Sequence, residues 1–193
     1  MLEQLPALDR TEALRYLRIR GGVVPPDLEG AFDRCESSLR SAARPRSVWR
    51  LFDREPDGRL AGTDFLPAGE SIRHHLSGCD QVILMAATLG SEAESLLRRT
   101  QKLDMSDALI LDALGSTAIE AVCDRLCDEI AEKMFPRRLT SRFSPGYGDL
   151  PLEQQGELFA VLDVTRRIGV SLSASGLMLP QKSVTALIGV KQA

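Results

Sequence analysis

The chain has 193 residues, of which 44% are hydrophobic and 26% are charged, and its formal net charge is −3. A chain of this length buries roughly 70% of its unfolded surface and needs neither a disulfide nor a metal to fold. The slightly negative charge excludes the basic surface of a nucleic-acid-binding protein. We expect one domain over residues 1–193, with a helical N-terminal segment (1–45) and an α+β core (46–193).

Two helices are predicted in the N-terminal segment. Asp9 can accept a hydrogen bond from the first free amides of the helix that follows it, and Gly21-Gly22 is expected to end that helix. Pro25-Pro26 opens a second helix that runs to about Ala43. Apolar residues at helical spacing give this second helix a core face, which consists of Leu28, Phe32, Cys35 and Leu39.

The first half of the core predicts a hairpin, a short helix and a buried strand. Residues 47–55 alternate in polarity, residues 56–58 (Pro-Asp-Gly) are typical of a turn, and residues 59–65 would form the second arm. A short helix is expected over residues 71–76. Residues 81–90 are almost continuously apolar, which indicates a strand buried on both faces.

Two helices follow, and the second is long. Residues 92–102 are rich in charge and predict an exposed helix. Residues 105–134 predict an apolar-rich helix that Pro136 ends. The centre of the long helix carries the small residues Gly115, Ser116 and Ala118. They permit the close approach of either another helix or a ligand, and the sequence favours neither.

The remainder of the chain predicts short strands around one more helix. Residues 139–143 are expected to form a strand, residues 151–162 a helix, and residues 170–175 and 183–190 the last two strands. The order of elements lacks a regular strand–helix–strand rhythm. The expected fold class is therefore α+β, with a mixed or antiparallel sheet and flanking helices.

Common catalytic and metal-binding motifs are absent from the sequence. It has no dinucleotide-binding loop, phosphate-binding loop, nucleophile elbow or zinc-protease motif. The two histidines, His74 and His75, are adjacent and would point about 100° apart on a helix, so we expect them at a surface helix end. We therefore predict no catalytic residue and no metal ligand.

The four cysteines are expected to be reduced core thiols. Cys123 and Cys127 are four residues apart on a predicted helix, which would supply half of a metal site. No third cysteine or histidine lies near them in the sequence, so burial is the preferred interpretation, as it is for Cys35 and Cys79.

The sequence contains no membrane segment or export signal that we recognise. Its longest apolar run, Val82–Ala87, is far shorter than the ~20 residues that cross a bilayer. The N-terminus MLEQLPALDR has neither the basic nor the apolar region of a signal peptide. Acidic residues interrupt the arginines between Arg40 and Arg54, which indicates a solvated face. We expect a cytoplasmic protein without a membrane or nucleic-acid partner.

The stretch RFSPGYGDLP, which begins at Arg142, has the composition of an exposed binding turn. Its first proline fixes one φ angle, and Gly146 and Gly148 permit positive φ on either side of Tyr147. Arg142 offers two parallel donors that suit a carboxylate. An amino-acid-like ligand would fit, with its carboxylate on Arg142 and the Tyr147 ring against the rest. The alternative is a plain tight turn beside a surface arginine.

Two blocks of the sequence resemble the methionine synthase activation domain family. RFSPGYGDLP resembles the family motif R-x-x-P-G-Y. IGVSLSASGLMLPQKSV, from Ile168 to Val184, resembles the second block, I-G-V-x-L-[ST]-x-S followed by M-x-P-x-x-S-V. The blocks occur in the family's order with one predicted helix between them. Weaker similarity covers LDRTEALRYL near the N-terminus and ALGSTAIEAVCDRL in the long helix.

The resemblance implies a C-shaped α+β domain that binds S-adenosylmethionine in a shallow site. Arg142 matches the arginine that holds the ligand carboxylate, and Gly146 and Tyr147 match the turn against which the ligand lies. Asp9 matches the aspartate that takes the ligand ammonium, which is a second interpretation of this helix-capping residue. Glu120 is expected to add a polar contact from the long helix.

The chain also departs from the family. Its turn reads G-Y-G-D where the full-length enzyme has G-Y-P. After Val184 it continues as TALIGVKQA, without the tyrosine-bearing turn of the full-length enzyme or the cysteine-rich tail of stand-alone relatives. We therefore expect a ligand site that lacks the cover found in the full-length enzyme.

The function implied by the resemblance is that of a reactivation subunit of cobalamin-dependent methionine synthase. Such a subunit binds S-adenosylmethionine and presents its methyl group when cob(II)alamin is reductively remethylated. The cobalamin would lie on a separate synthase that lacks its own activation module, and an electron-donor protein would supply the electron. The chain would be an accessory to a methyltransferase, without a complete active site. The alternative is a non-catalytic, S-adenosylmethionine-responsive or purely structural partner of a corrinoid methyltransferase.

Overall fold

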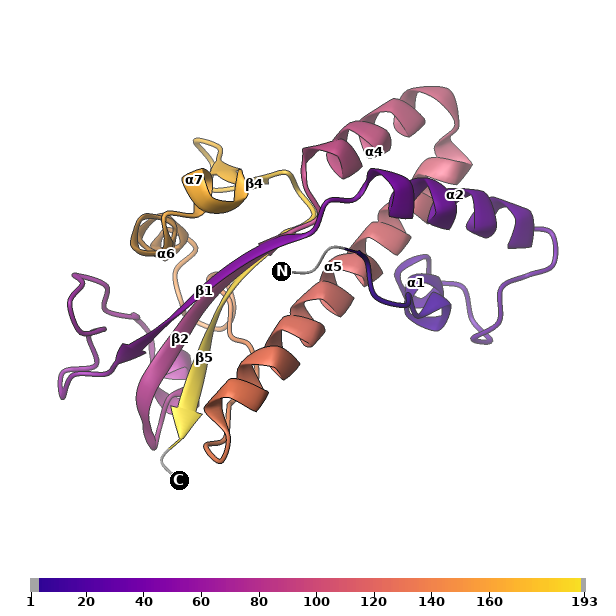
Figure 1. Ribbon diagram of the computed structural model, residues 1–193. Coiled ribbons are helices and arrows are strands. Elements are labelled where there is room, and N and C mark those ends of the chain that lie inside the picture. Colours follow the sequence, from indigo (N-terminus) through magenta and orange to yellow (C-terminus); the bar gives the residue numbers. More distant parts are fainter. Residues whose placement is uncertain (1–3, 192–193) are drawn as a thin grey trace.

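The computed structural model describes residues 4–191, so the first three residues of the N-terminal segment and the last two of TALIGVKQA lie outside the described residues. At its centre is a three-stranded antiparallel sheet in the order β1, β2, β5 (Figure 1). The strands are β1 (Arg46–Asp53), β2 (Cys79–Thr88) and β5 (Ser183–Lys191). The predicted α+β class with an antiparallel sheet is confirmed.

Helices cover both faces of this sheet. One apolar core joins α1, α2, α4 and α5 to one face, and a second core joins α3, α6 and α7 to the other (Figure 1). The helices are α1 (Arg10–Tyr16), α2 (Glu29–Ala42), α3 (Glu70–His75), α4 (Ser91–Leu103), α5 (Met105–Met134), α6 (Gln154–Leu162) and α7 (Val164–Ile168). A short hairpin lies beside α6 and α7, and each of its strands, β3 (Ser171–Leu172) and β4 (Met178–Leu179), has two residues.

Strand β2 is buried on both faces, as its continuous apolar sequence predicts. It pairs along its length with β1 on one side and β5 on the other, so that Leu84 lies opposite both Arg50 and Leu187. Successive side chains of a strand point to opposite faces. Ile83 and Met85 therefore enter the core under α5, while Leu84 enters the core under α6 and α7.

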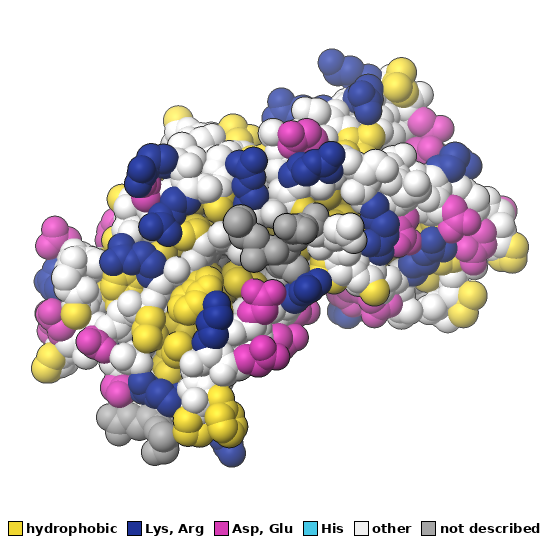
Figure 2. All heavy atoms as spheres, viewed as in Figure 1, with side chains coloured by type: hydrophobic (Ala, Val, Ile, Leu, Met, Phe, Trp, Pro, Cys, Tyr) yellow, Lys and Arg dark blue, Asp and Glu magenta, His cyan; other side chains and the backbone are white. Residues whose placement is uncertain are grey.

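The face of the sheet that is turned toward α5 is incompletely covered at β1. Trp49 and Leu51 are only half-buried there, and the Lys133 ammonium lies 5.3 Å from the centroid of the Trp49 ring. Figure 2 shows hydrophobic side chains gathered over part of the sheet, with charged side chains spread over the elements around them. The sheet thus has a partly exposed apolar area beside α5.

Asp9 caps α1 as predicted, but this helix ends earlier than expected. The Asp9 Oδ1 accepts a hydrogen bond from the Thr11 amide at 2.8 Å. The helix stops at Tyr16, before the glycines, because Arg18 adopts a φ of 59° and the Ile19 amide then bonds to the carbonyl of Leu14. Left-handed residues of this kind commonly end helices. The second helix, α2, likewise begins at Glu29, after the two prolines.

The predicted hairpin between residues 47–55 and 59–65 is wrong. The turn at residues 56–58 is present, but only one bridge, between Arg54 and Leu60, follows it. The second arm instead folds back on itself through a hydrogen bond from the Leu60 amide to the Phe65 carbonyl. The side chains of Leu60 and Phe65 therefore lie in the core beside α6. The long apolar strand β2, and not residues 59–65, pairs with β1.

Two of the strands predicted in the last third of the chain are reduced to isolated bridges or a two-residue strand. Residues 139–143 make isolated bridges to β5, at Leu139 with Val190 and at Phe143 with Leu187, but form no regular strand. Residues 170–175 contribute only the short β3, because the chain turns back at Ser173, whose amide bonds to the Leu177 carbonyl. The helix predicted over 151–162 begins at Gln154, whereas β5 and α5 match their predicted bounds closely.

Gly115 in α5 makes room for the side chain of Lys182, whereas Ala118 is buried in the core that joins α5 to α1 and α2. A Cβ on Gly115 would lie 3.1 Å from Cε of Lys182. The Lys182 ammonium donates to Ser116 Oγ at 2.8 Å and pairs with Asp112 at 2.8 Å. This lysine therefore ties the turn before β5 to the middle of α5.

The predicted core thiols are buried except one. Cys35, Cys79 and Cys123 are buried free thiols, whereas Cys127 is only partly buried.

His74 is exposed at the end of α3, as expected. Among the arginines predicted to form a solvated face, Arg54 departs because its guanidinium donates to the Leu76 carbonyl at 3.0 Å. No helix within residues 4–191 is long and apolar enough to cross a membrane.

Two glycines are predicted to respond in opposite ways to substitution by alanine. In Gly189→Ala the new Cβ would lie 2.6 Å from Cys79 Sγ and 3.0 Å from a Leu76 methyl group. We expect this overpacking to lower the free energy of unfolding by about 1–3 kcal/mol. Gly156 lies exposed in α6 with no atom within 4 Å of a built Cβ. We expect Gly156→Ala to raise stability by up to about 1 kcal/mol.

Urea unfolding of both variants and the unsubstituted protein would measure these changes. A Gly189→Ala variant as stable as the unsubstituted protein would contradict the close packing described between β5 and the end of α3.

Candidate functional site

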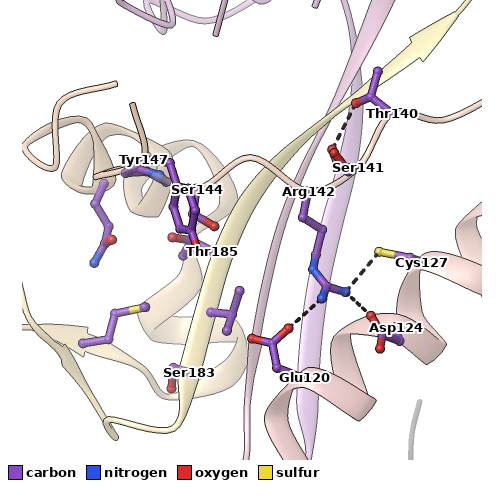
Figure 3. A pocket seen from close by; sticks show the side chains of 14 residues that line it. Glu120, Asp124, Cys127, Thr140, Ser141, Arg142, Ser144, Tyr147, Ser183 and Thr185 are labelled. Atoms are coloured by element: carbon purple, nitrogen blue, oxygen red, sulfur yellow. Dashed lines mark hydrogen bonds and ion pairs between the residues drawn. The ribbon is translucent and has the colours of Figure 1, made fainter. Parts of the chain in front are cut away.

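A pocket of about 610 Å³ lies at the β5 edge of the sheet. Figure 3 shows residues of α5 on one side of it, the turn that carries Tyr147 on the other, and the start of β5 between them. The lining residues are Glu120, Asp124, Cys127, Thr140, Ser141, Arg142, Ser144, Pro145, Tyr147, Gln155, Met178, Ser183, Val184 and Thr185. The pocket thus joins elements from both helical layers.

The pocket forms where the edge of β5 is left without a partner. Residues 138–143 bond to the outward-facing peptide groups of Leu187, Gly189 and Lys191. Because outward-facing residues alternate along a strand, the N–H and C=O of Thr185 also point to this edge. No backbone partner for them is found within residues 4–191. Pro145 lies next along the neighbouring segment and has no N–H to donate.

Arg142 is held between two carboxylates of α5. Its Nη2 is 2.7 Å from Glu120 Oε2 and its Nη1 is 2.7 Å from Asp124 Oδ1, while Nη1 also contacts Cys127 Sγ at 3.8 Å (Figure 3). The three acceptors lie on one face of the helix, at the i, i+4 and i+7 positions. Two carboxylates and one guanidinium leave this cluster a formal charge of −1.

The guanidinium is charged and still has free donors. Burial lowers the pKa of Arg142, but the hydrogen bond to Asp124 and the other neighbouring groups outweigh burial and raise this pKa above its ordinary value. An arginine has five N–H donors, and the contacts to Glu120, Asp124 and Cys127 use three of them. The Nε hydrogen and one Nη2 hydrogen have no partner within residues 4–191.

The turn at residues 144–150 presents Tyr147 to solvent beside the pocket. Gly146 adopts a φ of 90°, which favours glycine, and its amide bonds to the Leu150 carbonyl at 2.9 Å. The Tyr147 amide bonds to the Ser144 carbonyl at 3.0 Å. The Tyr147 side chain is 69% exposed and meets the Phe143 ring edge-on at 6.4 Å. A large aromatic surface is thus available at this end of the pocket.

Asp149 fixes this turn to the start of α3. Its carboxylate accepts hydrogen bonds from the amides of Glu70 at 2.7 Å and Ser71 at 2.9 Å. A Cβ on Gly148 would lie 2.7 Å from Ser71 Oγ, and one on Gly69 would lie 2.5 Å from Asp149 Oδ1. The G-Y-G-D sequence therefore has a structural cause, since a side chain at the second glycine would separate the turn from α3.

The residues predicted to bind a ligand are not all in one place. Glu120, Arg142 and Tyr147 line the same pocket, and Gly146 lies in the turn that carries Tyr147. Asp9 does not line the pocket. It lies at the N-terminal end of α1, a helix about 10 Å long. At the other end of α1, burial and then the charge of Glu120 raise the pKa of Tyr16.

Sequence reasoning missed several lining residues. Asp124 and Cys127 lie one and two turns after Glu120 on the same face of α5, so helical spacing from Glu120 would have found them. Gln155 and Met178 carry no such signal, because they come from different elements that only the fold brings together.

Comparison with known proteins identifies the family. The model of the family "Vitamin B12 dependent methionine synthase, activation domain" matches residues 59–193, which is more than half of the chain. The fold is similar to that in a crystal structure of the MetH reactivation domain bound to AdoHcy, with a TM-score of 0.66 and 18% sequence identity. That similarity covers 94% of this chain and 73% of the other. No curated protein sequence matches the chain.

The attachment of Asp149 to α3 predicts a pH-dependent contribution to stability. Hydrogen bonds from the Ser71 and Glu70 amides lower the pKa of Asp149 below its ordinary value. Its contribution is therefore present above the unfolded-state pKa, about 3.9, and is lost as the pH falls through the lower folded-state value. We expect Asp149→Ala to lower the melting temperature at pH 7, with a difference from the unsubstituted protein that shrinks below about pH 4.

Thermal unfolding followed by circular dichroism between pH 7 and pH 3 would measure this difference. Asp27→Ala is the matched control, because Asp27 is exposed and makes no side-chain hydrogen bond within the described chain. Equal melting temperatures for Asp149→Ala and Asp27→Ala at pH 7 would show that the turn is held by other contacts.

Proposed function

Because the chain belongs to the family of vitamin B12-dependent methionine synthase activation domains, we propose that it binds S-adenosylmethionine and presents the methyl group to cobalamin on a separate methionine synthase. The known fold that it shares was crystallised with AdoHcy, the product that remains when S-adenosylmethionine has lost its methyl group. The observation that carries the proposal is the guanidinium of Arg142 between two carboxylates at the edge of an open pocket.

This cluster suits the amino-acid end of the ligand. The two free donors of Arg142 would bind the ligand carboxylate, and Glu120 and Asp124 would bind its ammonium. S-adenosylmethionine also carries a positive sulfonium, so its net charge of about +1 at neutral pH complements the cluster's formal charge of −1. A ligand with both charged groups can therefore bind without separating the existing ion pairs.

The turn at residues 144–150 would support the rest of the ligand. We propose that the Tyr147 ring lies against it and that Gly146 keeps the turn close, since a side chain there would be strained at a φ of 90°. Asp9 is proposed as a second partner of the ammonium. One of its oxygens caps α1, and the other has no partner within residues 4–191.

In the proposed reaction this chain binds and orients the methyl donor. Cobalamin on the synthase would supply the reduced cobalt that accepts the methyl group, and an electron-donor protein would supply the electron. Arg142, Glu120 and Asp124 would hold the amino-acid end, and Tyr147 would limit the movement of the sulfonium. No proton moves during methyl transfer from a sulfonium, so positioning is the contribution required of these residues.

We predict that Arg142→Lys weakens S-adenosylmethionine binding nearly as much as Arg142→Ala. A lysine ammonium is a single point of charge, so it cannot pair with Glu120 and Asp124 and also bind a carboxylate with two parallel donors. Isothermal titration calorimetry would measure the dissociation constants. Arg125→Lys is the control, because Arg125 lies on the same helix, pairs with Glu129 alone among residues 4–191 and does not line the pocket. Unchanged affinity in Arg142→Lys would refute the two-donor arrangement.

We also predict that the chain supports remethylation of a synthase that lacks its own activation module. The test mixes the synthase in its cob(II) form with this protein, S-adenosylmethionine and a chemical reductant, and follows methylcobalamin by absorption. We expect methylation with the unsubstituted protein and little with Arg142→Ala, because the donor must be held at a near-attack distance of about 3–3.5 Å. Equal rates without the protein would refute the reactivation role. Binding without methylation would favour an S-adenosylmethionine-responsive partner.

A further inference from the structure

The two ends of the pocket differ in charge. The end formed by α5 and Arg142 holds every charged side chain that lines the pocket. The opposite end is lined by the uncharged side chains of Tyr147, Gln155 and Met178. Since α5 and α6 cover opposite faces of the sheet, the uncharged end lies across the β5 edge from the carboxylates. A ligand with a charged and an uncharged half would therefore have one defined orientation.

Gln155 has a largely buried side chain with an unpaired acceptor at the uncharged end. This residue, in the first turn of α6, is only 4% exposed, yet it lines both the pocket and an adjoining depression of about 470 Å³. Its Nε2 donates to the Gly176 carbonyl at 3.0 Å. Its Oε1 has no hydrogen-bond partner within residues 4–191. A ligand N–H that donates to this oxygen would add a hydrogen bond inside the pocket, so a ligand with such a donor gains affinity.

The orientation of this amide is fixed by chemistry. A carbonyl only accepts hydrogen bonds, so the NH₂ group of Gln155 must face Gly176 and Oε1 must face away from it. The preceding residue provides a contrast. Gln154 accepts from the Ala68 amide through Oε1 and donates to the Leu66 carbonyl through Nε2, both at 2.8 Å. Both polar atoms of the Gln154 amide thus have a partner within the fold, whereas Gln155 has one acceptor to offer.

We propose that Gln155 determines specificity for adenine by accepting a hydrogen bond from its 6-amino group. This inference rests on the proposed binding of S-adenosylmethionine. The 6-amino group donates only, whereas ribose hydroxyls can donate or accept and would give no comparable selection. The adenine is also the part of the ligand farthest from the amino-acid end. Tyr147 and Met178 supply apolar surface for the ring at the same end of the pocket.

The first experiment needs no substitution in the protein. Calorimetry would compare S-adenosylhomocysteine with its 6-deamino analogue, in which hydrogen replaces the amino group. We expect the analogue to bind about tenfold more weakly, because it leaves Oε1 unpaired. Equal affinity for the two compounds would overturn the role of Gln155 but not the proposed function. If neither S-adenosylmethionine nor S-adenosylhomocysteine binds, both the proposed function and this inference are wrong.

Two matched variants assign the discrimination to a residue. In Gln155→Met the acceptor is lost, so we expect the affinity ratio of the two compounds to fall to about one. In Gln154→Met the contacts to residues 66–68 are lost, so we expect a lower melting temperature but an unchanged ratio. Circular dichroism would verify folding of both variants. A tenfold ratio retained by folded Gln155→Met would overturn the proposal. If that variant does not fold, the comparison in the unsubstituted protein still decides.

Discussion

The site depends on a strand that has no solvent-facing side. Residues 82–87 of β2 are apolar and buried at every position, so both faces of the sheet must be covered. That requirement places α5 on one face and α6 on the other, in two separate apolar cores. The two layers come together at the edge strand β5, where the pocket is open to both. Its two carboxylates therefore come from one layer and Gln155 from the other.

The ion pairs around Arg142 and the hydrogen bonds of Asp149 have different roles. The Arg142 side chain is 22% exposed and its partners Glu120 and Asp124 are 44% and 68% exposed, so water screens these pairs and they contribute little to the free energy of folding. Their placement at the pocket is what the proposed binding of a zwitterion requires. Asp149, in contrast, satisfies two amides at the start of α3 and holds the turn that carries Tyr147. In the proposed function one cluster binds the ligand, and the other holds the turn that supports it.

Much of the fold could be predicted from the sequence because its long elements have strong local patterns. The uninterrupted apolar run of β2 and the capped, proline-terminated α5 are examples. The hairpin after β1 could not be excluded locally, since its failure depends on the competing partner β2. Arg142 and Tyr147 were found through a motif, and Glu120 through similarity to a family helix. Gln155 was missed because the free acceptor of a buried amide depends on Gly176, twenty-one residues away in the chain.

The open edge at Thr185 bears on whether another strand could join the sheet at β5. Unpaired strand edges are templates for joining another chain's sheet, and proteins protect them with charge, proline or brevity. Here residues 138–143 cover the far part of β5, Pro145 stands beside the gap, and Lys182 precedes it. The uncovered stretch is limited to Ser183–Thr185, too short to pair stably with a second strand. The same brevity that leaves room for a small molecule thus limits strand pairing with another chain at this edge of the sheet.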